Sequence, residues 1–263
     1  MKKRTPQILG ATIFVCVATF ALIIGQGVRS QNTADKNSHA TTAGQEDATP
    51  VQEGVKTERQ REHGKIFSER YAYRKEQKLR DIGWHKDIQV KIGVGDRPTD
   101  PSAPPFNLEE FIRNMTCDSD AILVGQVKNK VSQLTENEEF TFTDYDITVE
   151  EVIKNNATSP INVQSNITVT RPGGTIQLGG RIIRGIDASY KPFALGSRVL
   201  LFLKFIPTTG AYKAFRSEGS FVLSGDKLVK LTEEDLPAEL ENEKDAEVFS
   251  AKIRSYAVQT CNR

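Results

Sequence analysis

A run without any charged side chain extends from Ile8 to Ile24 near the start of the sequence. A helix satisfies its own backbone hydrogen bonds, so such a run can enter hydrocarbon. At about 1.5 Å per residue it spans roughly 25 Å, the short edge for a bilayer core. A core helix of a globular domain would carry a polar stripe, and this run has none. We therefore expect a targeting helix here rather than a buried core helix.

The charges that flank this run set its expected orientation. Three cations occupy positions 2–4 and only Arg29 follows soon after the run, which places the N-terminus in the cytoplasm and the bulk of the chain outside it. Residues 1–30 are then a signal anchor or a signal peptide. Retention gives a single-pass membrane protein, whereas a cut before Gln31 gives a secreted or periplasmic one, and both alternatives stay open.

Three polar segments are expected between this helix and the folded domain. Mean hydropathy is −0.42 and the apolar fraction is 38%, so part of the chain is expected to lie outside any core. Residues 31–54 have almost no large apolar side chain and predict a disordered tether. Residues 55–83 are dense in Glu, Lys, Arg and Gln and predict a charged, solvated helix. Residues 84–106 are rich in proline and predict an extended linker.

The remainder, 107–263, has the pattern of a β domain. Asn107 can cap a short helix from Leu108 to Thr116. Apolar, β-branched runs then follow in series, at 121–131, 140–153, 167–170, 175–178, 181–184, 199–203, 212–215, 220–223 and 227–231. Short consecutive strands without intervening helices predict an antiparallel sandwich or barrel, which a helix over Ala238–Gln259 completes.

The long run at 140–153 changes its phase along its length. Phe140 and Phe142 share one face, whereas the apolar residues at alternate positions over 145–149 share the other. A strict period of two cannot bury both sets on one face. We therefore predict bulges near 143–144 and near 150–151, which would also bend the strand as a barrel requires.

Three segments carry a resemblance to a known group of folds. They are Ala121–Val127, the strand end Val149–Lys154, and Leu195–Leu203. Together they resemble the core of the netrin-like and metalloproteinase-inhibitor-like OB-type barrels, and of exported bacterial domains built the same way, over about Asp118–Leu231. The resemblance implies a mainly β, antiparallel OB-like barrel with flanking helices, preceded by the membrane helix and the disordered tether.

The inhibitory chemistry of that group depends on a cysteine at the mature N-terminus that chelates zinc. The nearest equivalent is Cys117, which lies well inside the chain and has no free α-amino group. The chelate is therefore not expected here. Cys117 and Cys261 are instead expected to form a structural disulfide. The environment outside the cytoplasm is oxidising, and two cysteines outside the membrane allow one pairing.

Recognisable catalytic patterns are absent from the sequence. His39, His63 and His85 lie before the expected barrel and show no metal-ligand spacing, so we expect no catalytic residue, no metal and no cofactor. Asp144 and Asp146 share one face of a strand and could serve as acid–base carboxylates or bind calcium. At strand spacing, a solvated face is the interpretation we favour.

Binding of nucleic acid would need exposed aromatic rings among basic residues. The candidates for such a patch are Arg181, Arg184, Arg198, Tyr190 and Phe193. Basic and acidic residues balance across this part of the chain, and its expected location is extracytoplasmic, so no nucleic-acid partner is expected.

The function expected from the sequence is a non-catalytic, membrane-tethered extracytoplasmic interaction module that binds a protein or an envelope component of unknown identity. The alternatives are an exported enzyme with a carboxylate-based site and a protease-inhibitor-like binding domain. A concave cleft in which several carboxylates converge would favour the enzyme.

Overall fold

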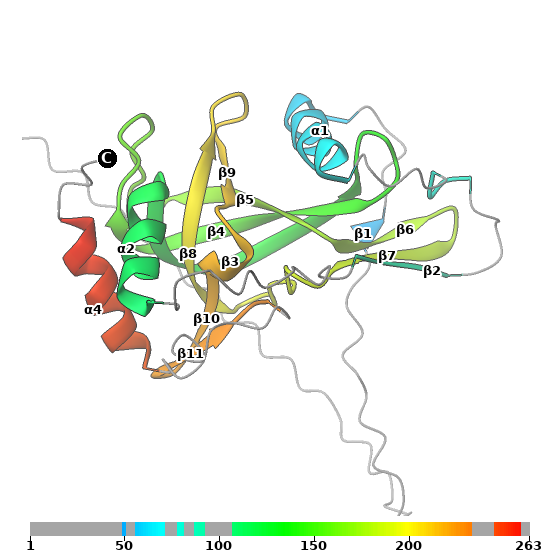
Figure 1. Cartoon of the computed structure of the whole chain (residues 1–263). Coiled ribbons are helices and arrows are strands. Elements are labelled where there is room, and N and C mark those ends of the chain that lie inside the picture. The colour runs from blue at the N-terminus through cyan, green and yellow to red at the C-terminus, as the bar shows by residue number, and fades with distance from the viewer. Residues whose placement is uncertain are drawn as a thin grey trace, which may run out of the picture. The chain divides into compact units, whose positions relative to one another are not determined.

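The computed structural model describes residues 49–50, 56–71, 78–81, 87–92, 107–232 and 245–258 (Figure 1). The chain divides into two compact units, Met1–Gly44 and Gln45–Arg263, and every described residue belongs to the second. The predicted targeting helix over 1–30 lies outside the described residues. Among the helices that are described, none has the length and apolar character needed to cross a membrane.

The fold is mainly β, as predicted, and contains two sheets. The larger sheet comprises β3 (Ala121–Leu134), β4 (Thr141–Lys154), β5 (Asn166–Pro172), β8 (Arg198–Ile206), β9 (Ala211–Ala214), β10 (Ser220–Ser224) and β11 (Lys227–Lys230). Its order is β11-β10-β8-β3-β4-β5-β9, and β9 pairs with β8 as well. Following the paired strands from β3 through β4, β5, β9 and β8 therefore leads back to β3. All are antiparallel except β5–β9.

The smaller sheet comprises β1 (Thr49–Pro50), β6 (Gly174–Leu178), β7 (Arg181–Asp187) and β2 (Ile88–Ile92), in the order β1-β6-β7-β2. β1 lies inside the segment expected as tether, and β2 lies inside the segment expected as linker. Both pair in parallel, β1 with β6 and β2 with β7. β2 joins the sheet because Ile88, Val90 and Ile92 alternate, and Ile92 is buried.

The helices within the described residues are α1 (Glu58–Tyr71), α2 (Leu108–Asp118), the 3₁₀ turn η1 (Ser217–Gly219) and α4 (Ala246–Ala257). The Asn107 side chain caps α2 by accepting from Glu110 N at 3.0 Å, as predicted. Asp245 caps α4 by accepting from the amides of Glu247 and Val248. In Figure 1, α2 and α4 lie together at one end of the larger sheet.

Strand β8 is buried on both faces, as its apolar run predicted. Leu200 and Phe202 pack beneath α2 and α4, in a cluster with Phe249. Leu201 and Leu203 point the other way, into a second cluster enclosed by the larger sheet. The core thus lies on both sides of this strand.

Strand β4 contains one of the two bulges that the sequence predicted. Register shifts against β3 leave Glu150 out of the pairing, so the bulge near 150–151 is confirmed. The bulge predicted near 143–144 is wrong, because both residues pair regularly with β3. The phase change has another cause: Phe142 is buried on the second face, where its ring stacks on Phe67 of α1 with the centroids 5.6 Å apart. Helix α1 therefore buries Phe142 on the second face of the strand, so no bulge is needed to turn it to the first face.

Candidate functional site

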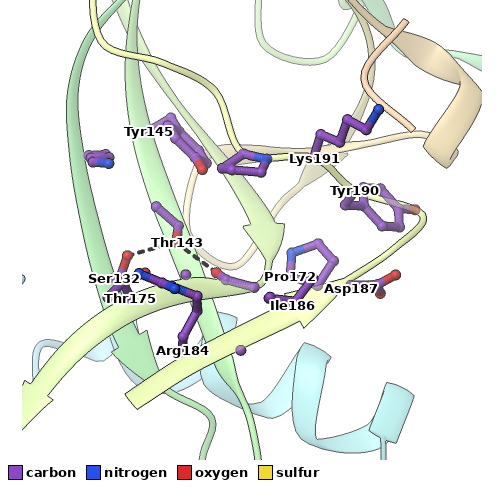
Figure 2. A pocket seen from close by; sticks show the side chains of 15 residues that line it. Ser132, Thr143, Tyr145, Pro172, Thr175, Arg184, Ile186, Asp187, Tyr190 and Lys191 are labelled. Carbon is purple, nitrogen blue, oxygen red and sulfur yellow. Dashed lines mark hydrogen bonds between the residues drawn. The ribbon is translucent and has the colours of Figure 1, made fainter. Parts of the chain in front are cut away.

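A cavity of about 210 Å³ opens where the larger sheet meets β6 and β7 (Figure 2). Ser132, Thr143 and Tyr145 of β3 and β4 form one side of it. The corner between β5 and β6 and the strand β7 form the next sides, and the segment over 190–192 forms the last. Five separate parts of the chain therefore build this concave surface.

The corner between β5 and β6 depends on two glycines. Gly173 and Gly174 have φ of 90° and 143°, which favour glycine. The Thr143 hydroxyl donates to Gly173 O at 2.7 Å and lies 2.8 Å from the Ser132 hydroxyl. In the sequence, Pro172-Gly173-Gly174 and Gly179-Gly180 are both typical of hairpin turns. The first prediction is wrong, because β5 and β6 belong to different sheets. The second is confirmed, because Gly179-Gly180 joins the antiparallel pair β6 and β7.

The lining of the cavity is predominantly cationic. Lys130, Arg184 and Lys191 are half-buried at its edge, against the single carboxylate of Asp187. Asp187 Oδ1 accepts from Ser189 N at 2.9 Å. Within the part of the chain that is described, no ion pair joins Lys130 or Lys191 to a carboxylate. Charges of one sign in a concave, partly desolvated site act more strongly than on an open surface.

A fourth cation, Arg171, lies behind the wall of the cavity. It is 1% exposed and stands opposite Thr143 in the β4–β5 register. Its Nη1 donates to Lys191 O at 2.7 Å, and its guanidinium carbon lies 4.1 Å from the ring centroid of Phe193 and 5.3 Å from that of Tyr190. These contacts hold the segment 190–193 in place as a wall.

Burial lowers the pKa of Arg171 to about 10, and the neighbouring Tyr145, Tyr190 and Asp187 oppose that shift. The guanidinium therefore stays charged at neutral pH. Its Nε and Nη2 have no hydrogen-bond acceptor among the described residues. Two aromatic faces, the Lys191 carbonyl and the negative charge of Asp187 offset the cost of burying this charge.

A second polar cluster joins three distant segments. His63 of α1 is fully buried, with Nδ1 2.8 Å from Asp144 Oδ1 and Nε2 2.9 Å from Thr209 Oγ1. Hydroxyl, imidazole and carboxylate follow one another as in a hydrolytic triad. However, the imidazole is inaccessible, and the amides of Thr209 and Gly210 both donate to Ile206 O, so they do not form an oxyanion site. The geometry suits an anchor for α1.

Other contacts at α1 support this interpretation. Gly64 O accepts from Glu136 N at 3.2 Å, and a Cβ on Gly64 would lie 3.2 Å from the same nitrogen. Ser68 Oγ donates to Asn137 Oδ1 at 3.1 Å. Helix α1, which covers Glu58–Tyr71 of the charged helix expected over 55–83, thus packs on the β3–β4 hairpin, and glycine permits the close approach. The expectation of a fully solvated helix is wrong for this part.

We expect His63→Ala to lower the free energy of unfolding by about 2 kcal/mol, since it leaves Asp144 and Thr209 without their buried partner. Chemical denaturation measures the loss, and hydrogen exchange of the α1 amides locates it. Lys65→Ala is the matched control, because Lys65 lies on the exposed side of the same helix and, among the described residues, forms its ion pair with Glu62. Equal effects of the two substitutions would contradict an anchoring role.

The carboxylates considered from the sequence do not form a joint site. Asp144 binds His63, whereas Asp146 accepts from Asn129 Nδ2 at 3.2 Å. No cluster of residues suited to a metal ion occurs within the described segments. His39 and His85 lie outside those segments.

The basic and aromatic residues considered for nucleic acid are also separated. Arg181 is buried and donates to Leu79 O at 2.6 Å, and Arg198 pairs with Glu150 at 2.6 Å. Of the three arginines, only Arg184 lines the cavity. Tyr190 and Phe193 are buried against Arg171 instead of forming an exposed stacking platform.

Lys130, Thr143 and Lys191 belong to the cavity but were not anticipated from the sequence. The one local signal near them is Pro172-Gly173-Gly174, which marks a sharp change of chain direction but not what gathers around it. Cys117 lies in the last turn of α2, and Cys261 falls outside the described residues. No protein-family model matches this chain, and no curated protein matches it significantly.

Proposed function

We propose that this protein is a non-catalytic, membrane-tethered extracytoplasmic binding module, and that the cavity beside the β5–β6 corner receives a group presented by a protein or envelope component. The observation that carries the proposal is the composition of the cavity: three cations, hydroxyl groups and aromatic rings surround a single carboxylate. An enzyme that uses a pair of carboxylates would need a second carboxylate close to Asp187. Asp187 is the only carboxylate among the described residues that line the cavity.

The proposal includes an OB-type barrel held outside the cytoplasm by the N-terminal helix. Support for the barrel comes from the five-strand ring of pairings β3–β4–β5–β9–β8, since OB folds are five-stranded barrels. Support for the tethering comes from the uncharged run Ile8–Ile24 and the cations before it. A disulfide between Cys117 and Cys261 fits the same oxidising location.

Crosslinking in the native membrane, followed by identification of the partner, tests the binding function. The double variant K130E/K191E reverses two charges at the cavity, and we expect it to reduce recovery of the partner at least tenfold. K227E is the matched control, because Lys227 is exposed on the β10–β11 hairpin and does not line the cavity. Recovery of no specific partner, or equal recovery from both variants, would refute the proposed function.

A further inference from the structure

A groove separate from the cavity lies between α1 and the strands β5, β8 and β9. Its volume is about 730 Å³, within the range of pockets that hold small organic ligands. In Figure 1, α1 lies beside the hairpin of β8 and β9, and His63 fixes it there through its 2.9 Å hydrogen bond to Thr209 of that hairpin. Pro172 and Tyr190 line both the groove and the cavity, which share no other described lining residue.

The floor of the groove carries one row of polar side chains. Thr170 of β5 stands opposite Lys213 of β9, and Lys213 stands opposite Lys204 of β8, so all three lie on one face of the sheet. Thr170 also stands opposite Asp144, which binds α1 through His63, so this is the face that α1 covers. The row therefore lies on the groove side of the sheet and not on the core side.

Two groups of this row lack a partner within the described chain. Thr170 is 1% exposed, and its hydroxyl oxygen makes no hydrogen bond to a described residue. Lys213 is exposed and pairs with no described carboxylate, whereas Lys204 Nζ donates to Asp120 Oδ1 at 2.9 Å. A buried hydroxyl without a partner costs free energy, and like charges opposite each other repel. An acceptor with one negative charge beside Thr170 and Lys213 would relieve both.

Apolar side chains lie next to this row. Pro172 follows Thr170 by two positions and Phe215 follows Lys213 by two. Because β5 and β9 run parallel, Pro172 and Phe215 lie on the same side of the row. Helix α1 adds further apolar side chains to the lining, at Ile66 and Phe67. The groove is therefore polar at one end and apolar at the other.

Backbone pairing and charge narrow the choice of ligand. Along the floor, β5 is paired with β4 and β9, and β9 is paired with β5 and β8, so no free strand edge is offered to a peptide backbone. Glu69 of α1 adds a negative charge to the lining against Lys204 and Lys213, and this balance disfavours a dianion. A compact head with one negative charge on an apolar chain matches both features.

We infer that this groove binds an aliphatic monocarboxylate of the fatty-acid class. Its carboxylate accepts hydrogen bonds from the Thr170 hydroxyl and the Lys213 ammonium, and its alkyl chain lies against Pro172, Phe215 and the apolar side of α1. The site goes beyond the proposed function and does not depend on it, because the cations of the cavity take no part in it.

Titration calorimetry of the full chain in lipid nanodiscs, with empty nanodiscs as the blank, tests the site with hexanoate as the probe. We expect saturable binding of hexanoate at pH 7.5. It should be at least tenfold tighter than binding of acetate, which lacks the chain, and of hexanamide, which lacks the charge. Lys213→Gln should weaken hexanoate binding at least fivefold. Lys227→Gln should leave it unchanged, because Lys227 is exposed on the β10–β11 hairpin and does not line the groove.

Thr170→Val separates a ligand-binding hydroxyl from a structural one. Valine removes a hydroxyl that has no described partner, so the melting temperature should not fall, whereas hexanoate binding should weaken at least threefold. A lower melting temperature would show that the hydroxyl already has a partner and would overturn its role in binding.

Three results would overturn the inference as a whole: no saturable binding of hexanoate, equal binding of hexanamide, or tighter binding of an apolar tripeptide through its C-terminal carboxylate. Each leaves the proposed function standing, because recovery of the crosslinked partner by K130E/K191E tests that function separately.

Discussion

Reduction of the folded protein is expected to lower its free energy of unfolding by up to about 5 kcal/mol, through loss of a disulfide between Cys117 and Cys261. A bond between these positions closes a loop that includes the larger sheet and strands β6 and β7 of the smaller one. In the chain-entropy model, the stabilisation grows with the logarithm of loop length and reaches about 5 kcal/mol for loops longer than 100 residues. This is the largest effect that a single covalent change is expected to have on this chain.

Cys117 lies at the end of β4 that α4 also contacts. Lys154 Nζ donates to Cys117 O at 3.1 Å, and Arg254 in the last turns of α4 binds Glu151 at 3.0 Å. Glu151 and Lys154 both belong to the same end of β4, so the ends of α2 and α4 meet there. Cys261 follows α4 by only a few residues in the sequence, so the expected bond would join the end of α4 to the end of α2.

Denaturation with and without reductant measures the stabilisation, and thiol alkylation counts the cysteines released. Cys117→Ser, Cys261→Ser and the double variant should be equally destabilised, because either single substitution already removes the bond. Cys16→Ser is the control and should change nothing. If reduction released no additional thiols, or if the two single effects simply added, the disulfide would be disproved.

The strands of the larger sheet could be predicted because their signals are local. The apolar run over 199–203 needs no knowledge of its neighbours to indicate a strand buried on both faces, and β8 is buried on both faces. The helix caps at Asn107 and the hairpin at Gly179-Gly180 are local for the same reason. Each of these features is decided by residues that lie within one element or one turn.

The docking of α1 could not be predicted, because its determinants lie far apart in the sequence. A glycine inside a helix is unfavourable when the segment is considered alone, whereas the missing side chain of Gly64 permits contact with the β3–β4 hairpin. His63 was set aside as lying outside the barrel, whereas it bridges Asp144 and Thr209. Composition alone cannot tell a charged helix with one seated face from a charged helix surrounded by water.

The cavity depends on both local and long-range features of the sequence. Gly173 and Gly174 indicate a change of chain direction, which is local, but the sequence does not show that β5 ends one sheet there and β6 begins the other. Arg171, which precedes that corner, has the sequence context of an exposed turn residue and is nevertheless buried. A buried arginine is unusual enough that only the assembled surroundings, aromatic rings and a carbonyl, explain it.

We expect Gly174→Ala to destabilise the protein by about 3 kcal/mol, the second largest effect, and to close the cavity. Two independent costs add. The backbone has φ of 143°, which a side chain disfavours by about 1–2 kcal/mol, and overpacking of a filled site costs about 1–3 kcal/mol. A Cβ on Gly174 would overlap Thr143 Oγ1 and lie 2.6 Å from Ser132 Oγ, the two hydroxyls on the cavity side.

Gly180→Ala separates these two costs. Gly180 also has positive φ, 79°, but a Cβ there would meet no atom within 4 Å, so only the backbone term of about 1 kcal/mol applies. The free energies of unfolding of the two variants, measured by urea denaturation, should therefore differ by about 2 kcal/mol. If the two variants were equally stable, the close approach at the β5–β6 corner would not exist in solution. The cavity that this approach shapes would then lose its structural basis.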